Sequence, residues 1–329
     1  MVWIEFVVSA LLIVYVAIKL AEYGDALAAR TGLGGLFVGT LLIAGTTSLP
    51  EVLTSISSLQ LGEPNLAAGN LFGSNMFNMF MLAVVDMVNH RKRILRGAAM
   101  KHTLTGSLTM LLVAFAVFFI LADIDLSLGW IGADSMVIML LYIVAVWLIY
   151  RQSPQPGPSH AAPPIPDSVP KLGVALFGFA LAAAGLIFIT PWMVRTSNEI
   201  ATITGLGTTF IGTTLVALVT SLPELVTTIT AIRLGAADMA VGNLFGSNMF
   251  NMFALGLTDV FFTQGRFLSV VDPAFLVIAS LGLIMTGMAL IGNLARLERR
   301  VLFIELDALA LVLVYFGGIW LLYTRGIAP

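Results

Sequence analysis

The chain has 329 residues, of which 59% are hydrophobic and only 10% are charged. Soluble domains carry about 25% charged residues, so the solvent around most of this chain must be lipid. The formal net charge of -2 offers no basic face for a nucleic acid, and the absence of cysteine excludes disulfides, thiol catalysis and cysteine-ligated metals.

A helix that spans a bilayer needs about 20 consecutive apolar residues. Ten segments meet this requirement and are predicted to be transmembrane helices: residues 2–21, 33–59, 65–89, 103–122, 130–150, 172–193, 206–232, 238–262, 272–293 and 302–324. The first segment lacks the basic start and the cleavage site of a signal peptide, so we expect it to be retained. The sequence therefore predicts an all-α, polytopic membrane protein with ten transmembrane helices.

An internal duplication divides the chain. The stretches Thr47–Glu51 and Gly69–Phe80 recur unchanged as Thr220–Glu224 and Gly242–Phe253. Between the fifth and sixth predicted helices the sequence is rich in Pro, Ser and Ala, which is a linker composition. We expect a first five-helix repeat at residues 1–150, a Pro-rich linker at 151–171 and a second five-helix repeat at 172–329.

The odd number of helices in each repeat predicts an inverted topology. The second repeat must then enter the membrane from the opposite side, as in many secondary transporters. With the amino terminus outside, the basic residues on outer segments are Arg195, Arg266 and Arg325, and the others face the cytoplasm. The positive-inside rule therefore places both termini outside and the linker in the cytoplasm, in a protein of the plasma (inner) membrane.

Two acidic residues lie deep inside apolar segments, at Glu51 and Glu224. A lone carboxylate at such a depth costs several kcal/mol, so it must be protonated, paired or bound to a cation. The sequence places no Lys or Arg at comparable depth. A protonated glutamic acid bonded to a neighbouring helix is the structural alternative, but recurrence in the same polar cluster of both repeats favours a cation site.

Oxygen donors surround these acids in the sequence. Thr47 lies one helical turn before Glu51, hence on the same face. Pro50 and Pro223 have no N–H and free a backbone carbonyl one turn earlier, and such irregular backbone survives at membrane depth where it is buried in protein or lines a cavity. Carbonyl, hydroxyl and carboxylate oxygens suit hard cations such as Na⁺ and Ca²⁺.

The next helix of each repeat carries a polar stripe with one residue per turn: Asn70, Ser74 and Asn78, then Asn243, Ser247 and Asn251. Hydrogen bonding between helices is one interpretation, and ion binding beside the two acids is the other. Glycines in the same runs, at 69, 73, 242 and 246, form a surface that lets helices approach closely. We expect the Met and Phe residues there to pack in the core. Four aspartates near predicted helix ends are expected to be solvated: Asp86, Asp134, Asp259 and Asp307.

These motifs resemble the two alpha-repeats of the sodium/calcium exchanger family, within the cation/calcium exchanger superfamily. In that family a G-T-S-L-P-E-like stretch is followed by G-N-x-x-G-S-N-x-x-N/D. The first copy here reads Gly45–Glu51, with one inserted Thr, and then Gly69–Asn78. The second copy reads Val219–Glu224 and then Gly242–Asn251.

The resemblance implies a central ion site built by the second, third, seventh and eighth helices, past which the first and sixth helices slide. It implies that the Ca²⁺ ligands are Thr47, Glu51, Thr220 and Glu224. It implies that Na⁺ sites are formed with Ser48, Ser74, Asn78, Ser221 and Ser247. Asn251 stands where well-known exchangers have Asp. The metal site that includes Asn251 is therefore expected to hold two carboxylates, and transport is expected to be weakly electrogenic or electroneutral.

We therefore predict a secondary active Na⁺/Ca²⁺ antiporter with no cofactor and no obligate protein partner. A Ca²⁺/H⁺ exchanger is an alternative, because related exchangers also pair two Glu, although their second motif differs. A cation channel is the alternative from another class, but inverted repeats around a midplane site favour alternating access. An anion carrier is disfavoured by the acidic core.

An intramembrane enzyme is not expected. Intramembrane proteolysis needs a Ser–His pair, a His-rich metal site or two facing aspartates. The histidines, at positions 90, 102 and 160, lie outside the predicted helix centres, and no aspartate pair lies at depth.

Overall fold

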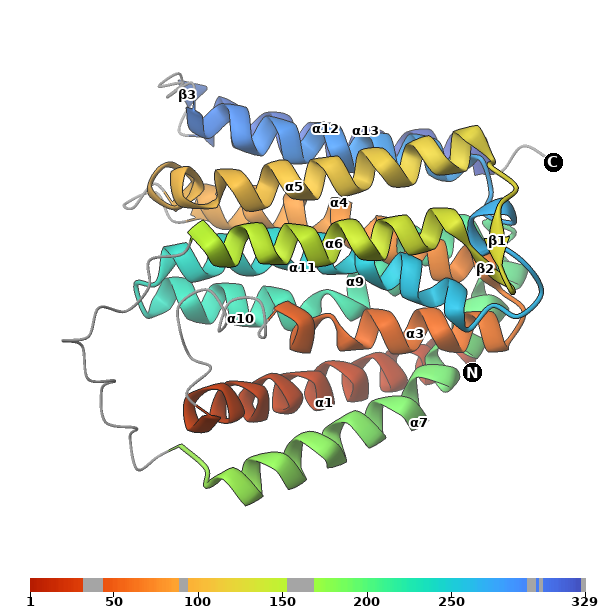
Figure 1. The fold of residues 1–329 in the computed structure, drawn as a ribbon, viewed down its shortest axis with the longest axis horizontal. Helices are drawn as coiled ribbons and strands as arrows, with labels where there is room; N and C mark the ends of the chain where they lie inside the picture. Colours follow the sequence, from red (N-terminus) through yellow and green to blue (C-terminus); the bar gives the residue numbers. More distant parts are fainter. Residues whose placement is uncertain (32–43, 89–93, 153–168, 295–299, 302–303, 327–329) are drawn as a thin grey trace.

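The computed structural model describes residues 1–31, 44–88, 94–152, 169–294, 300–301 and 304–326. Most of the predicted Pro-rich linker, at 153–168, and the start of the second predicted helix, at 33–43, lie outside the described residues. The described chain is a bundle of long helices that run close to parallel with one another (Figure 1).

The first half of the described chain begins with α1 (Val2–Thr31). A helical stretch at 44–47 is interrupted at Ser48 and continues as α3 (Leu49–Gln60), and α4 (Pro64–Val88) follows after a short turn. Helices α5 (Ile94–Ala122) and α6 (Ala133–Gln152) are joined through a small antiparallel hairpin, β1 (Ser127–Leu128) and β2 (Ile131–Gly132).

The second half opens with α7 (Leu172–Thr204). The next helix is broken into four pieces: α8 (Gly207–Ile211), a π-helical turn η1 (Gly212–Val216), α9 (Ala217–Thr220) and α10 (Leu222–Arg233). Helix α11 (Ala237–Val260) and the 3-10 turn η2 (Phe267–Ser269) precede α12 (Ala274–Leu294). A second hairpin, β3 (Arg300–Val301) with β4 (Ile304–Glu305), leads into α13 (Leu306–Gly326).

Seven of the described helices are long and apolar enough to cross a membrane. The pair Gly207–Thr220 and Leu222–Arg233, bent by 41°, makes an eighth candidate. The predicted class, a helical polytopic membrane protein, is thus supported, whereas the count of ten stays a prediction. The second predicted helix falls partly outside the described residues, and α11, which carries the polar stripe, is not among the eight.

Helices α1 and α7 extend beyond the predicted ends at residues 21 and 193. Both predictions stopped where polar residues begin. The polar end of α1 remains helical and is held by its own contacts: Lys19 pairs with Glu22 at 2.7 Å, and Arg30 donates to the carbonyl oxygens of Val169 and Pro170 at 2.6 and 3.0 Å. A transmembrane helix can therefore continue past the hydrocarbon layer.

The helices form a core and a peripheral pair. Helices α4 and α11 lie inside, contacted by α5, α6, α12 and α13, while α1 and α7 pack along each other at the edge (Figure 1). Helix α1 begins and α13 ends at the same side of the bundle. Each repeat therefore contributes one helix to the edge pair and one to the centre.

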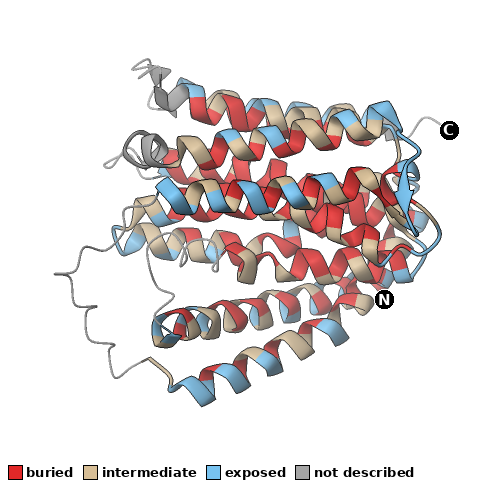
Figure 2. Ribbon diagram, in the orientation of Figure 1, coloured by how far each residue is buried: buried red, intermediate tan, exposed pale blue. Residues whose placement is uncertain are grey.

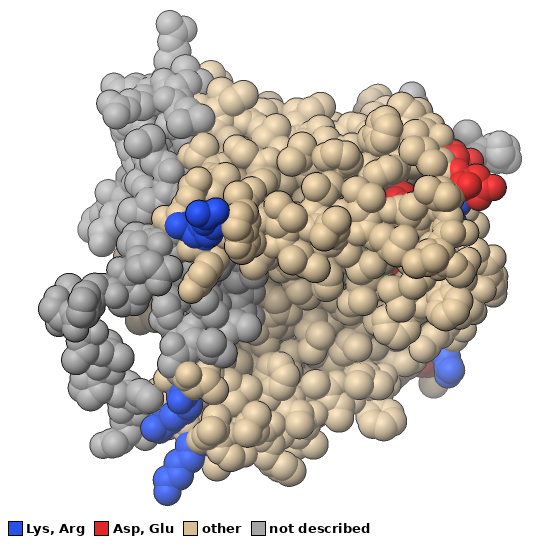
Figure 3. Space-filling view, viewed as in Figure 1, with Lys and Arg blue, Asp and Glu red and all other residues tan. Residues whose placement is uncertain are grey.

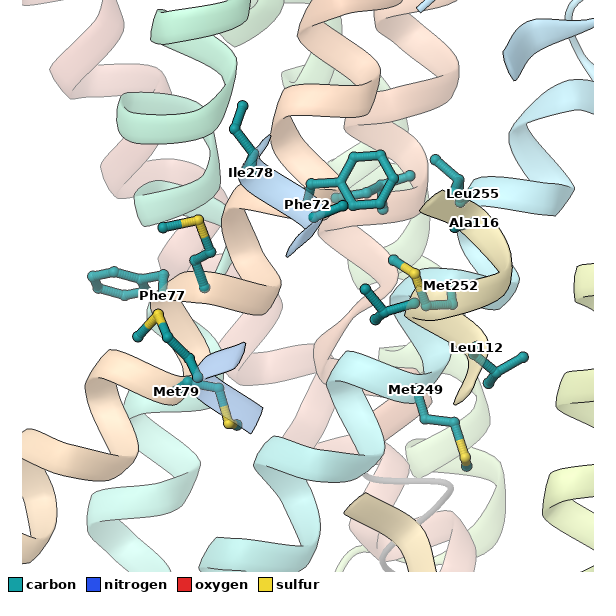
Figure 4. Close-up of a cluster of buried hydrophobic side chains, with 14 of the residues drawn as sticks. Phe72, Phe77, Met79, Leu112, Ala116, Met249, Met252, Leu255 and Ile278 are labelled. Carbon is teal, nitrogen blue, oxygen red and sulfur yellow. The ribbon is translucent and has the colours of Figure 1, made fainter. Parts of the chain in front are cut away.

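Apolar packing fixes the two central helices. Figure 2 shows the buried residues concentrated on the inner helices. In Figure 4, Phe72 and Met79 of α4 and Met249 and Met252 of α11 lie in one hydrophobic cluster with Leu112 of α5. The predicted packing role of the Met and Phe residues in the repeated runs is confirmed.

Charge is distributed as a membrane requires. On the face drawn in Figure 3, the visible charged side chains gather towards the two ends of the bundle, and the broad middle of the described surface carries neither sign. The uncharged middle of this face matches the hydrocarbon layer of a bilayer.

The prediction that the helix-end aspartates are solvated is wrong for Asp86, Asp134 and Asp259, which are buried. Asp259 accepts hydrogen bonds from the backbone N–H groups of Gly132 and Phe267, at 2.7 and 2.5 Å. The guanidinium of Arg266 lies 3.5 Å from Asp134. The loops after α5 and α11 fold back and supply hydrogen-bond donors to Asp259 and a guanidinium to Asp134. Such contacts cannot be predicted when each helix is considered separately.

The predicted close approach of helices at the repeated glycines is confirmed for α4. A Cβ atom placed on Gly69 would lie 2.8 Å from the backbone nitrogen of Thr213, and one on Gly73 would overlap the carbonyl oxygen of the same residue. The backbone of α4 therefore lies directly against the π-helical turn η1, which brings the central helix of one repeat against the broken helix of the other.

This contact predicts the effect of a single methyl group. Gly73→Ala should destabilise the protein by about 1–3 kcal/mol, because overpacking forces rigid backbone apart. Gly317→Ala in α13 is the matched control, since a Cβ there meets no atom within 4 Å, and alanine favours helix over glycine by about 1 kcal/mol. Thermal unfolding midpoints in detergent micelles measure both, and equal midpoints for the two variants would contradict the packing argument.

Candidate cation site

The two acidic motifs have the same local backbone. Ser48 and Ser221 interrupt their helices with φ, ψ of -86°, 6° and -88°, 1°. The backbone N–H of each serine still bonds one turn back, to Ala44 at 3.0 Å and to Ala217 at 3.1 Å. Pro50 and Pro223 have no N–H to donate to the preceding turn, so a new helix starts directly after each serine. The first turn of that helix carries the glutamate. The positive end of a helix dipole thus lies beside each carboxylate.

The carboxylates are held by serines from the opposite repeat. The hydroxyl of Ser48 donates to Oε1 of Glu224 at 2.9 Å, and the hydroxyl of Ser221 donates to Oε1 of Glu51 at 3.2 Å. Ser247 of α11 adds a hydrogen bond to Glu224 at 3.4 Å. Both glutamates are at most 1% exposed and interact electrostatically with each other. The site is therefore shared between the repeats.

Threonines and the stripe of α4 complete the inner face. Thr220 donates to Oδ1 of Asn70 at 2.9 Å and lies 3.4 Å from the hydroxyl of Ser74. The side-chain amide of Asn70 in turn donates to the backbone carbonyl of Glu51 at 2.9 Å. Thr47 bonds the carbonyl of Ala44 in its own helix at 3.2 Å. A chain of polar contacts thus runs from α9 through α4 to α3.

An amide cluster joins α4 to α11 one turn further along. Asn78 donates to Oδ1 of Asn248 at 2.8 Å, and Asn251 donates to Oδ1 of Asn75 at 3.0 Å. The side chain of Asn248 also donates to the backbone carbonyl of Asn75 at 3.1 Å. Asn75 and Asn248 were missed as site residues in the sequence. Their presence in both copies of an identical run at membrane depth was the available signal.

All ten residues predicted for the metal site are buried: Thr47, Ser48, Glu51, Ser74, Asn78, Thr220, Ser221, Glu224, Ser247 and Asn251. The structure brings Ser48, Ser221, Ser247 and the two glutamates into direct contact. Asn78 and Asn251 belong to the amide cluster, where each donates to another asparagine rather than to a carboxylate. The predicted residues therefore form two adjoining groups, one acidic and one neutral.

Four buried oxygens in these groups have no hydrogen-bond partner within the described part of the chain. They are Oε2 of Glu51 and Glu224 and Oδ1 of Asn78 and Asn251, two pairs of repeat-equivalent atoms. An unsatisfied buried acceptor is costly, and more so when it is charged. Oxygens of this kind are the ligands that Na⁺ and Ca²⁺ prefer, whereas soft metals would require cysteine, which the chain lacks. The arrangement can bind a hard cation.

A family model described as sodium/calcium exchanger protein matches residues 1–151 and 174–324. The inner membrane protein YrbG of Escherichia coli is 30% identical over 76% of this chain and 77% of its own length. A solved H⁺/Ca²⁺ exchanger, CAX, has a TM-score of 0.71 at 14% identity, over 99% of this chain and 85% of that one. The sodium-calcium exchanger NCX_Mj has a TM-score of 0.58 at 20% identity, over 97% and 99%.

The fold and the site, two acids from two repeats inside a helical membrane bundle, define a membrane exchanger of cations. The chain belongs to the sodium/calcium exchanger protein family. The two structural likenesses are below 25% identity and show the shared fold alone.

The crossed serine bonds predict matched effects of two substitutions. Ser48→Ala and Ser221→Ala should each raise the Ca²⁺ concentration for half-maximal uptake by about 10- to 150-fold, because a hydrogen bond to a charged group contributes about 1.5–3 kcal/mol. Thr286→Ala is the control, since this buried hydroxyl donates to the carbonyl of Gly282 in its own helix. Uptake titrations in proteoliposomes measure the effect, and an unchanged midpoint for both serine variants would refute the role assigned to them.

Proposed function

We propose that this protein is a secondary active antiporter that exchanges Na⁺ for Ca²⁺ at a site shared by Glu51 and Glu224. The observation that carries the proposal is the pair of crossed hydrogen bonds, Ser48 to Glu224 and Ser221 to Glu51. They hold the two acids, one from each repeat, at a single buried site. Two negative charges balance one Ca²⁺ or two Na⁺, so the two kinds of ion compete for the same oxygens.

The proposed topology is ten transmembrane helices in two inverted repeats, residues 1–150 and 172–329, joined by a cytoplasmic linker at 151–171. The matching backbone at Ser48 and Ser221 supports the repeat. The start of α1 and the end of α13 at one side of the bundle fit an even number of crossings. The bias of Lys and Arg towards one side supports a topology with both termini outside, in the plasma (inner) membrane.

Within the shared site we assign the Ca²⁺ to Thr47, Glu51, Thr220 and Glu224. The structure supports this set because Thr47 lies beside Glu224 and Thr220 lies beside Glu51, so each acid has a hydroxyl from the opposite repeat. The serines and asparagines are assigned to Na⁺: Ser48, Ser74, Asn78, Ser221, Ser247 and Asn251. Their neutral oxygens suit a monovalent ion better than a divalent one.

Ca²⁺/H⁺ exchange is the second candidate. Its support is that both glutamates can be neutralised by protons as well as by Na⁺, and that CAX, which has a similar fold, is an H⁺/Ca²⁺ exchanger. A third carboxylate, which would favour a further Na⁺, is replaced by Asn251. A cation channel built on the same acids would conduct Ca²⁺ without any countersubstrate.

The decisive experiment is Ca²⁺ flux in proteoliposomes loaded with Na⁺, with a proton gradient imposed in parallel vesicles. An outward Na⁺ gradient should drive Ca²⁺ uptake in the wild type. Glu51→Gln and Glu224→Gln should each reduce it at least 100-fold, because removal of one charge leaves Ca²⁺ uncompensated in a low-dielectric site. Uptake driven by the proton gradient alone would favour the second candidate, and uptake with neither countersubstrate would favour a channel.

The charge count predicts a further result. Exchange of one Ca²⁺ for two Na⁺ moves no net charge, so wild-type uptake should not respond to membrane potential. Asn251→Asp adds a third carboxylate and should make uptake potential-dependent, while Asn251→Gln should stay insensitive. Uptake at potentials set by K⁺ and valinomycin checks this, and clear charge movement by the wild type would contradict the two-carboxylate argument.

A further inference from the structure

The two repeats present equivalent helix faces in different surroundings. Thr54 and Ser57 follow Glu51 at intervals of three residues in α3, which keeps them on neighbouring lines of the helix surface. At the shift of 173 residues that separates the repeats, their equivalents after Glu224 are Thr227 and Thr230 of α10. Thr54 and Ser57 are buried, whereas Thr227 is half-buried and Thr230 is exposed.

Helix α7 contacts one residue of the first pair, Ser57. The hydroxyl of Thr190 in α7 lies 3.1 Å from the hydroxyl of Ser57, and this contact is buried. Two turns further along α7, the side-chain amide of Asn198 donates to the carboxylate of Glu63 at 2.6 Å. Glu63 lies in the turn between α3 and α4, so the two contacts fasten α7 along the whole second half of α3.

Helices α1 and α10 lack the residues that would form the equivalent two hydrogen bonds. At the shift that aligns the repeats, Thr190 corresponds to Ala17, Asn198 to Asp25 and Glu63 to Ala236. The alignment holds in this region, since residues 31–34 and 204–207 both read Thr-Gly-Leu-Gly. Ala17 has no hydroxyl for Thr230, and Ala236 has no acceptor on its side chain. The hydroxyl of Thr230 instead donates to Val226 in its own helix at 2.8 Å.

The joint that follows α7 permits it to pivot. Gly205 ends α7 with φ of 70°, and Gly207 opens α8 with φ of 73°. Both glycines have the left-handed backbone conformation that glycine adopts readily. They lie between α7 and the broken helix that carries Glu224. The edge helix can therefore change its angle without disturbing the backbone of the site.

We propose that the contacts Thr190–Ser57 and Asn198–Glu63 form a one-sided latch that biases the protein towards the conformation in which α7 covers α3. In that conformation the approach to the site along α3 is closed and the approach along α10 is open. The opposite conformation, with α1 covering α10, lacks both hydrogen bonds. The transport cycle that this inference serves is the proposed exchange, but the bias itself does not depend on which ions are exchanged.

The absence of cysteine allows a direct test in the full-length protein. Thr54→Cys reports on the closed approach and Thr227→Cys on the open one, and neither position belongs to the latch. A small water-soluble methanethiosulfonate should label Cys at 227 readily and Cys at 54 slowly. Labelling is measured without Na⁺ or Ca²⁺, so that the result is separate from the exchange proposal.

Breaking the latch should increase labelling at position 54 selectively. Thr190→Val or Asn198→Ala should each raise that rate roughly 5-fold, and the double variant up to about 30-fold, because each lost hydrogen bond shifts the ratio of the two conformations by about that factor. Labelling at position 227 should change by less than about 2-fold, since the open conformation is already the major one. An unchanged rate at 54 in the double variant, or equal increases at both positions, would overturn the proposal.

A transplanted latch gives a second test that removes no latch contact. The combination Ala17→Thr, Asp25→Asn and Ala236→Glu installs the missing partners on α1 and beside α10. It should raise labelling at 54 and lower labelling at 227. Failure of either change would show that these contacts do not set the bias. A labelling shift in a protein without Na⁺-driven Ca²⁺ flux would leave the latch standing and refute the exchange proposal alone.

Discussion

The cost of burying two carboxylates governs this molecule. Glu51 and Glu224 lie at membrane depth with one oxygen of each bonded to a serine from the other repeat and the second oxygen without a partner in the described chain. Neither acid forms an ion pair with a basic side chain among the described residues, so its charge must be neutralised by a proton or by a bound cation. A site that is costly when empty and favourable when filled is what a carrier needs, because it resists crossing the membrane unloaded.

Close backbone packing makes that shared site possible. Gly69 and Gly73 allow α4 to touch the π-helical turn η1, which positions Thr220 against Asn70 and Ser74. The breaks at Ser48 and Ser221 then turn each glutamate towards the serine of the opposite repeat. Side chains that lie far apart in the sequence meet because the backbones of α4 and η1 pack directly against each other.

Periodicity and duplication were enough to predict the helical membrane class, the acidic pair and the packing role of the repeated Met and Phe residues. Features that depend on how separate helices meet could not be predicted. In the sequence, nothing distinguishes Asn75 and Asn248 from other polar residues of the repeated runs. Their importance follows from the hydrogen bonds that they accept from Asn251 and Asn78 of the opposite repeat. Burial of Asp259 depends on a distant loop folding over it, which hydropathy cannot show.

The interleaving of the two halves has a consequence for synthesis. Helix α1 packs on α7, α5 packs on α11 and α4 packs on η1, so the main contacts of the first repeat are with the second. Until the carboxyl-terminal half emerges from the ribosome, the carboxylate of Glu51 lacks its bond from Ser221, and Asn75 lacks its bonds from Asn248 and Asn251. The nascent amino-terminal half must therefore wait in the bilayer as loosely associated helices, protected by lipid, water or insertion machinery, and the ion site forms only in the last step of folding.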